Sequence, residues 1–205
     1  MKKTSRFTCL MVALVLSCNA FAADPTLPQL RDELMKMGEL DQAVRHRAEQ
    51  GDFKDWAATD AKNQQRLKQI VEQYGWPSYA MVGQDGAFAA WLLAQHSDSD
   101  KPFQNKVLAL MEPLVDAGQA SGKEFAYLYD RTHYPQRFGT QGTCVNRGEW
   151  LPFDIEEIGG LEARRMKAGM PTMAVYVAKL NEVCANFTAV KGGTDTRRTI
   201  PVPKP

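Results

Sequence analysis

The sequence predicts a mainly α-helical protein, a compact bundle of about six or seven helices with a small irregular or β insertion near 136–153. Two observations predict it. Apolar residues recur at three- and four-residue steps through most of the chain, which is the period of an amphipathic helix. Between Pro135 and Phe153 this period gives way to closely spaced glycines and short β-like pieces.

Glycines and prolines mark the ends of the predicted helices. Gly51 ends the first helix, Gly75 is placed as a C-terminal cap of the second, and Pro102 suits the first turn of the fourth. Pro135 ends the fifth helix, and Gly169 stops the short helix that follows the insertion. The predicted ranges are about 28–50, 56 or 60 to 74, 87–96, 102–117, 122–134, 161–168 and 171–183.

Two of these helices carry unusual patterns. The third is apolar all round and has its polar residues, Gln95 and His96, only at its end, which is typical of a central buried helix. It follows a predicted turn at Val82–Gly86. On the fifth, Tyr127, Asp130, Arg131 and Tyr134 form an aromatic face with a charged centre, which is unusual for a solvated surface.

The first 22 residues predict a secretory signal peptide. Lys2, Lys3 and Arg6 precede a short apolar run that ends in a small-x-small cleavage site at 20–22, so we expect cleavage after Ala22 and a periplasmic location. The alternative is a lipoprotein signal that leaves a lipidated Cys18. A leucine directly before the small residue is unusual for that motif, so cleavage after Ala22 is favoured.

The remaining chain has the size of one α-helical domain, at 23–187, followed by a disordered basic tail at 188–205 that is rich in glycine, threonine and proline. Losing three basic residues with the signal lowers the net charge from +1 to about −2. This balance argues against nucleic-acid binding and against an anionic membrane surface. No other apolar run is long enough for a transmembrane span.

Cys144 and Cys184 form an even pair in a compartment expected to be oxidising, so a disulfide is predicted. Two buried thiols are the alternative. No histidine lies at ligand spacing from either cysteine, and the spacing of His96, Asp98 and Asp100 matches no metal motif. We therefore expect neither a metal nor another cofactor.

Six polar residues form the candidate binding site, in three clusters amid apolar helix: Gln95, His96, Asp130, Arg131, Gln136 and Gln141. His96 is the candidate catalytic residue, as a general base; alternatively it binds an anion or interacts with carbonyls at its helix end. Arg131 with the two later glutamines offers donors for a small anion or a sugar. Alternatively, Arg131 organises the irregular segment, and Gly139 of the FGTQ turn allows a close approach to a neighbouring helix rather than to a ligand.

Several motifs occur in series and resemble a bacterial domain family of unknown function. They are GWP (75–77), VGQDG (82–86), AAWLLAQH (89–96), AYLYDR (126–131), QRFGTQ (136–141) and LEARRMKAGMP (161–171). The chain departs from the family pattern at Phe138, where the family usually carries tyrosine, which puts any role of that hydroxyl in doubt. The resemblance covers most of the mature chain and implies no activity.

The residues favour an exported binding or interaction domain with a polar pocket. The alternatives are an envelope enzyme of the hydrolase type that uses His96 and Arg131, and an immunity or inhibitor protein that binds a toxin in the periplasm. No triad, zinc-protease, P-loop or dinucleotide motif occurs in the sequence, which weighs against a standard hydrolase.

Overall fold

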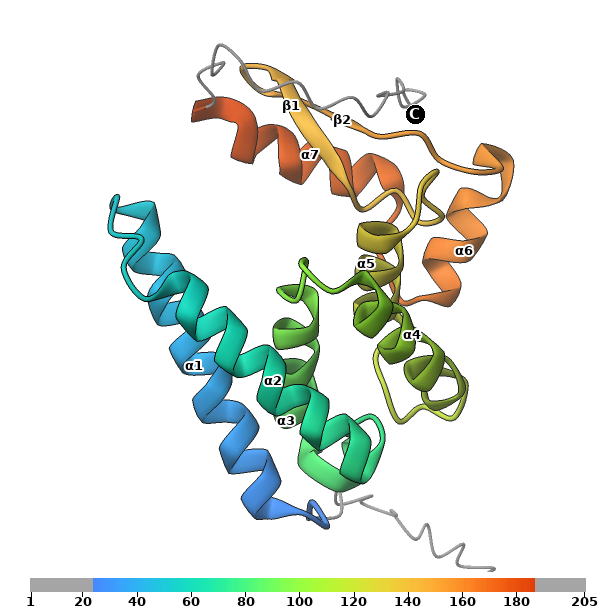
Figure 1. Ribbon diagram of the computed structural model, residues 1–205. Helices are drawn as coiled ribbons and strands as arrows, with labels where there is room; N and C mark the ends of the chain where they lie inside the picture. Colours follow the sequence, from blue (N-terminus) through green and yellow to red (C-terminus); the bar gives the residue numbers. More distant parts are fainter. Residues whose placement is uncertain (1–23, 187–205) are drawn as a thin grey trace, which may run out of the picture.

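The computed structural model describes residues 24–186, and the predicted signal peptide and basic tail lie outside the described residues. The described chain is mainly α-helical with one small antiparallel hairpin, which confirms the predicted fold class (Figure 1). The helices and strands are α1 (Pro28–Glu49), α2 (Trp56–Tyr74), α3 (Tyr79–Gln95), α4 (Lys101–Asp116), α5 (Gly122–Thr132), β1 (Gly142–Asn146), β2 (Glu149–Pro152), α6 (Leu161–Lys167) and α7 (Met173–Val183). Short 3-10 turns precede α6 and follow α7.

Helices α1 to α5 form the larger part of the molecule around one apolar core. Helix α3 packs against α1, α2, α4 and α5 and so lies at the centre, as its all-round apolar sequence predicts. A Cβ atom at Gly38 of α1 would lie 3.3 Å from the Cβ of Ala89, so glycine lets these two helices approach closely. The core includes Leu34, Leu67, Ile70, Val82, Ala90, Leu93, Val107, Met111 and Leu128.

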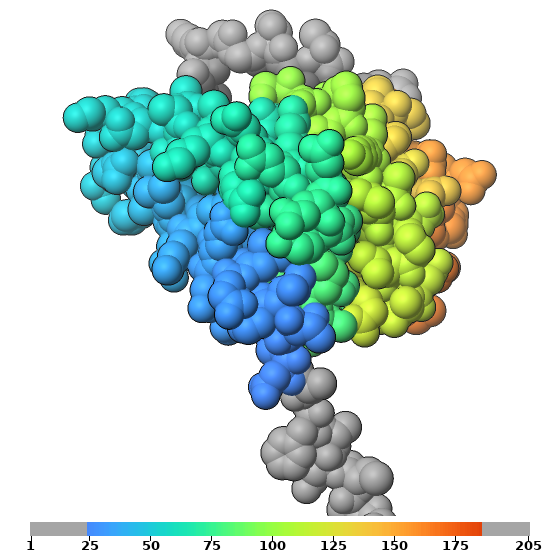
Figure 2. All heavy atoms as spheres, turned by 60° about the horizontal axis from the view of Figure 1, so that its bottom comes forward, coloured from blue at the N-terminus to red at the C-terminus, as the bar shows by residue number. Residues whose placement is uncertain are grey.

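The C-terminal part consists of the hairpin, α6 and α7, and lies on the opposite side of the molecule from α1 and α2 (Figures 1 and 2). A second, smaller apolar cluster joins Trp150 of β2 to Leu161, Met173 and Cys184. Because a Cβ atom at Gly142 would lie 2.3 Å from the Trp150 ring, the hairpin requires glycine there.

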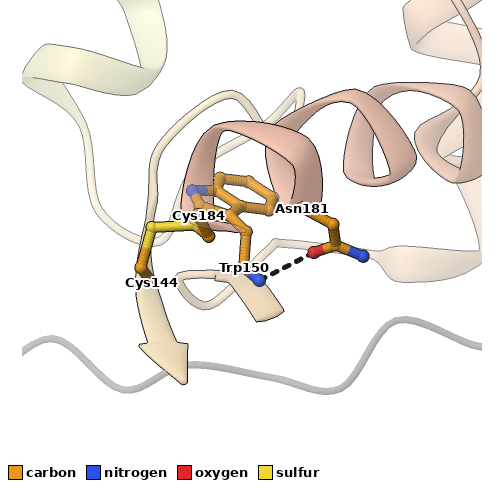
Figure 3. Close-up of a disulfide and its surroundings, with 4 residues drawn as sticks. All are labelled: Cys144, Trp150, Asn181 and Cys184. Atoms are coloured by element: carbon orange, nitrogen blue, oxygen red, sulfur yellow. Dashed lines mark hydrogen bonds between the residues drawn. A yellow bond between two sulfur atoms is a disulfide. The ribbon is translucent and has the colours of Figure 1, made fainter. Parts of the chain in front are cut away.

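The predicted disulfide between Cys144 and Cys184 is present, with a Cα–Cα distance of 5.7 Å (Figure 3). It links β1 to the end of α7. Beside it, the side chain of Asn181 in α7 accepts a hydrogen bond of 2.7 Å from the backbone N–H of Trp150 (Figure 3). The disulfide and this hydrogen bond therefore fasten the last helix to both strands of the hairpin.

The boundaries of two helices differ from the prediction. Helix α3 begins at Tyr79, and within the predicted turn at Val82–Gly86 only Gly83 leaves the helical conformation, with φ of 71°. Two helical segments therefore meet at a kink within the predicted turn, and α3 spans both of them. Helix α5 ends at Thr132, two residues before the predicted end. Within residues 24–186, no helix combines the length and the apolar composition that crossing a membrane requires.

We predict that replacing both cysteines by alanine lowers the free energy of unfolding by about 3–4 kcal/mol, because the disulfide closes a loop of 40 residues. Urea denaturation of the double variant and the oxidised wild type measures the difference. An unchanged midpoint with an unchanged slope would show that the disulfide does not stabilise the fold.

Candidate functional site

A polar cleft of about 540 Å³ lies between the first turns of α2, the end of α3 with the loop after it, and the end of α5. We call it the His96–Arg131 cleft. Its lining residues are Arg45, Trp56, Ala57, Asp60, Ala61, Gln64, His96, Ser97, Asp98, Ser99 and Arg131. Two of the six residues predicted for the site, His96 and Arg131, therefore line one cavity although 35 positions separate them in the sequence.

Arg131 lies at the cleft in an ion pair with Asp98. Its Nε donates a 2.7 Å hydrogen bond to one carboxylate oxygen, and Nη2 donates to the other, so the pairing is bidentate. Burial alone would raise the pKa of Asp98, but the hydrogen bonds and charge of Arg131, together with the charge of Lys101, hold it below its ordinary value. The arginine predicted to bind an anion is thus already engaged by a carboxylate of the same cleft.

Arg45 organises the opposite wall. Its Nη2 lies 3.1 Å from a carboxylate oxygen of Asp41 and 3.0 Å from one of Asp60. The guanidinium lies 4.8 Å from the ring centre of Trp56, and the indole N–H of Trp56 donates a 2.7 Å hydrogen bond to Asp60. Asp41 is 1 % exposed, so this network contains a buried carboxylate that Arg45 compensates.

His96 contacts the same network through one ring nitrogen. Its Nδ1 lies 2.9 and 3.0 Å from the two carboxylate oxygens of Asp41 and 2.9 Å from Nε of Arg45. A single Nδ1 either donates to Asp41 or accepts from Arg45, so the tautomer decides between these contacts. In the first case neutral His96 presents an acceptor at Nε2, and in the second it presents a donor there.

Two nitrogen donors of the cleft residues are unpaired. Nη1 of Arg45 and Nε2 of Gln64 are buried and have no hydrogen-bond partner among residues 24–186. An unpaired buried donor costs roughly 1–3 kcal/mol. Native proteins retain few such groups, and strain, a catalytic role or a bound water or ion explains those that they retain. Both atoms belong to side chains that line the cleft.

Asp130 lies away from the cleft and holds the turn at 137–140. It is 4 % exposed, and its carboxylate accepts hydrogen bonds from the backbone N–H groups of Arg137 at 2.7 Å, Phe138 at 3.0 Å and Thr140 at 2.8 Å. Burial raises the pKa of Asp130, and the hydrogen bonds from these N–H groups oppose that rise. All three bonds are internal to the fold.

Arg165 of α6 fixes the same turn from the other side. Its side chain is fully buried, and Nη1 donates a 2.6 Å hydrogen bond to the carbonyl of Phe138 while Nε donates to that of Pro171 at 2.9 Å. Its guanidinium carbon also lies 4.9 Å from the ring centre of Tyr176. Gly139 has φ of 70°, and a Cβ atom there would lie 3.0 Å from Ile155, so the glycine permits close packing within the chain.

Gln136 and Gln141 also bond within this segment. The amide of Gln136 donates 2.8 Å hydrogen bonds to the carbonyls of Gln141 and Phe153 and accepts one of 2.8 Å from the N–H of Gln141. The side-chain amide of Gln141 donates to the hydroxyl of Thr140 at 3.1 Å. Both glutamines line a separate cavity of about 130 Å³, together with Asp130 and Arg131.

Gln95 completes the six and does not line the cleft. It is buried in the last turn of α3, and its Oε1 has no hydrogen-bond partner among the described residues. The structure thus divides the predicted site. His96 and Arg131 line the cleft, Asp130, Gln136 and Gln141 hold the turn at 137–140 and the segment around it, and Gln95 lies apart in the core.

The prediction missed the wall formed by Asp41, Arg45, Trp56, Asp60 and Gln64. A signal for Asp41 was present, because it lies four residues after Met37 and three before Val44, on the apolar stripe of the first helix. A carboxylate on a buried stripe requires a partner, and Arg45 follows at i+4. For Gln64 the helical pattern gave no such signal. The described residues contain no group of three or more histidine, cysteine or acidic side chains that could hold a metal ion.

We predict that Asp130→Asn lowers the free energy of unfolding by about 2–3 kcal/mol, because the new NH₂ group faces a backbone N–H donor wherever it is placed. Asp116→Asn is the matched control, since that side chain is exposed and lies 3.9 Å from Lys167. Urea denaturation at neutral pH measures both variants. Equal stability of the two variants would contradict the role assigned to Asp130.

The searches of curated proteins and of solved structures returned no match to this chain. A family model does match, over residues 28–187, and its description is a family of unknown function, DUF6624. The match covers most of the chain and nearly all of its described part, and it confirms the resemblance drawn from the sequence motifs. The chain therefore belongs to the DUF6624 family.

Proposed function

We propose that this protein is an exported binding domain whose ligand site is the His96–Arg131 cleft. One observation carries the proposal: the two side chains that hold the unpaired nitrogen donors, those of Arg45 and Gln64, line the same cavity. A bound acceptor group would satisfy both donors and offset the cost of burying them unpaired. The volume of about 540 Å³ also falls within the range of small-molecule sites.

Gln64→Met gives the sharpest test, because methionine keeps the volume of glutamine and removes the unpaired donor. We expect this variant to be at least as stable as the wild type without ligand, since the group that it removes has no partner. The experiment is a thermal-shift screen of a library of sugars, amino acids, peptides and small anions. Compounds that bind in the cleft should raise the melting temperature of the wild type and have much less effect on the variant.

Gln65→Met is the matched control, since Gln65 is the exposed neighbour of Gln64 on α2 and does not line the cleft. It should respond to the library as the wild type does. The proposal fails if no compound stabilises the wild type, or if every stabilising compound acts equally on both variants.

A second candidate function, an enzyme that uses His96 as general base, is favoured by the contact with Asp41. A buried carboxylate that accepts a hydrogen bond from Nδ1–H fixes the imidazole and leaves Nε2 as the proton acceptor. Nitrogen-15 NMR of the neutral imidazole reads the tautomer directly. A proton on Nδ1 supports this candidate, whereas a proton on Nε2, with Nδ1 accepting from Arg45, removes it.

Export is the other part of the proposal. The N-terminal sequence supports it, because a charged start, an apolar run and a small-x-small site precede residue 23. The disulfide supports it as well, since such bonds persist in oxidising compartments. Mass spectrometry of the protein from fractionated bacterial cells should find a periplasmic chain that begins at Ala23 with both cysteines oxidised. A cytoplasmic chain that retains residues 1–22 would contradict export.

A further inference from the structure

We propose that the ligand of the His96–Arg131 cleft is a neutral polyhydroxylated molecule, a mono- or disaccharide. This inference rests on the proposed function and adds the chemical class of the ligand. It follows from three properties of the cleft: the balance of its charges, the mixture of donors and acceptors that its residues leave unpaired, and the apolar surface on α2.

The charges in and beside the cleft are balanced. Arg45 is paired with Asp41 and Asp60, and on the other wall Arg131 is paired with Asp98. Lys101 adds a positive charge 3.6 Å from Asp98, so three carboxylates face three cations. A phosphate or carboxylate would therefore find no uncompensated positive charge and would have to compete with aspartates for both arginines. An anionic ligand is disfavoured for this reason.

The unpaired groups include both donors and acceptors. Nη1 of Arg45 and Nε2 of Gln64 are donors without a partner. In the tautomer that donates to Asp41, Nε2 of His96 is an acceptor, and it forms no hydrogen bond with another residue in the described part of the chain. The hydroxyl of Ser99, on the loop at the same cleft, is likewise unpaired among those residues. A ligand hydroxyl donates and accepts at once, so several hydroxyls match this mixture better than a group that only accepts.

One face of α2 gives the cleft an apolar surface. Trp56, Ala57 and Ala61 line it together with Asp60 and Gln64. The spacing of these positions places them on adjacent turns of one helix face. Carbon-bound hydrogens of a sugar ring can pack on the methyl groups of Ala57 and Ala61, while its hydroxyls reach the polar groups of both walls. The cleft therefore offers an apolar surface for the carbon-bound hydrogens of a sugar ring and polar groups for its hydroxyls.

The test is saturation-transfer NMR followed by calorimetry on the full mature chain. The neutral probes are glucose, N-acetylglucosamine, maltose and cellobiose, and the anionic probes are inorganic phosphate and citrate. We expect at least one neutral sugar to bind, with an affinity that Gln64→Met lowers by about tenfold, the value of one hydrogen bond, and that Gln65→Met leaves unchanged.

Two results would overturn the inference. Suppose that phosphate or citrate binds in a way that depends on Gln64 while no sugar binds. The cleft is then a site for anionic ligands, so the sugar assignment fails and the proposed binding function survives. If neither set of probes binds, the sugar assignment fails, and the broader thermal-shift library then decides whether the cleft binds any small molecule.

Discussion

The buried carboxylate of Asp130 is the constraint on which the C-terminal third of the protein depends. A charge at 4 % exposure is costly unless hydrogen bonds compensate it, and three backbone N–H groups of the turn at 137–140 do so. Arg165 binds the same turn through the carbonyl of Phe138. The turn thus leads from α5 to β1, and its hydrogen bonds to Asp130 of α5 and Arg165 of α6 hold these two helices to it. The hairpin and α7 pack around a separate apolar cluster.

The same constraint determines the direction of Arg131. Adjacent residues on a helix point about 100° apart, so a helix that turns Asp130 toward the buried turn directs Arg131 elsewhere. Arg131 points to the cleft and pairs with Asp98 in the loop after α3. The end of α5 therefore has two roles, one in holding the fold together and one in lining the candidate site, and the two roles belong to neighbouring residues.

The helices, the hairpin region and the disulfide could be predicted from the sequence, because the spacing of apolar residues and the local composition indicate them. The sequence also predicted His96 and Arg131, which line the cleft, because His96 ends an otherwise apolar helix and Arg131 lies at the centre of an aromatic face. It could not predict that Arg45, on a highly charged helix, pairs with Asp60 of the next helix, since that contact depends on packing between helices. Nor could local sequence show that the amide of Gln136 is occupied by backbone groups.

Amide hydrogen exchange measured by NMR tests most directly the claim that Asp130 anchors the turn at 137–140. The account predicts that the amides of Arg137, Phe138 and Thr140 exchange as slowly as those of the helical core, although they lie outside helices and strands. Phe53, in the exposed loop between α1 and α2, serves as the fast-exchanging reference. Exchange of the three amides at the rate of Phe53 would contradict the account.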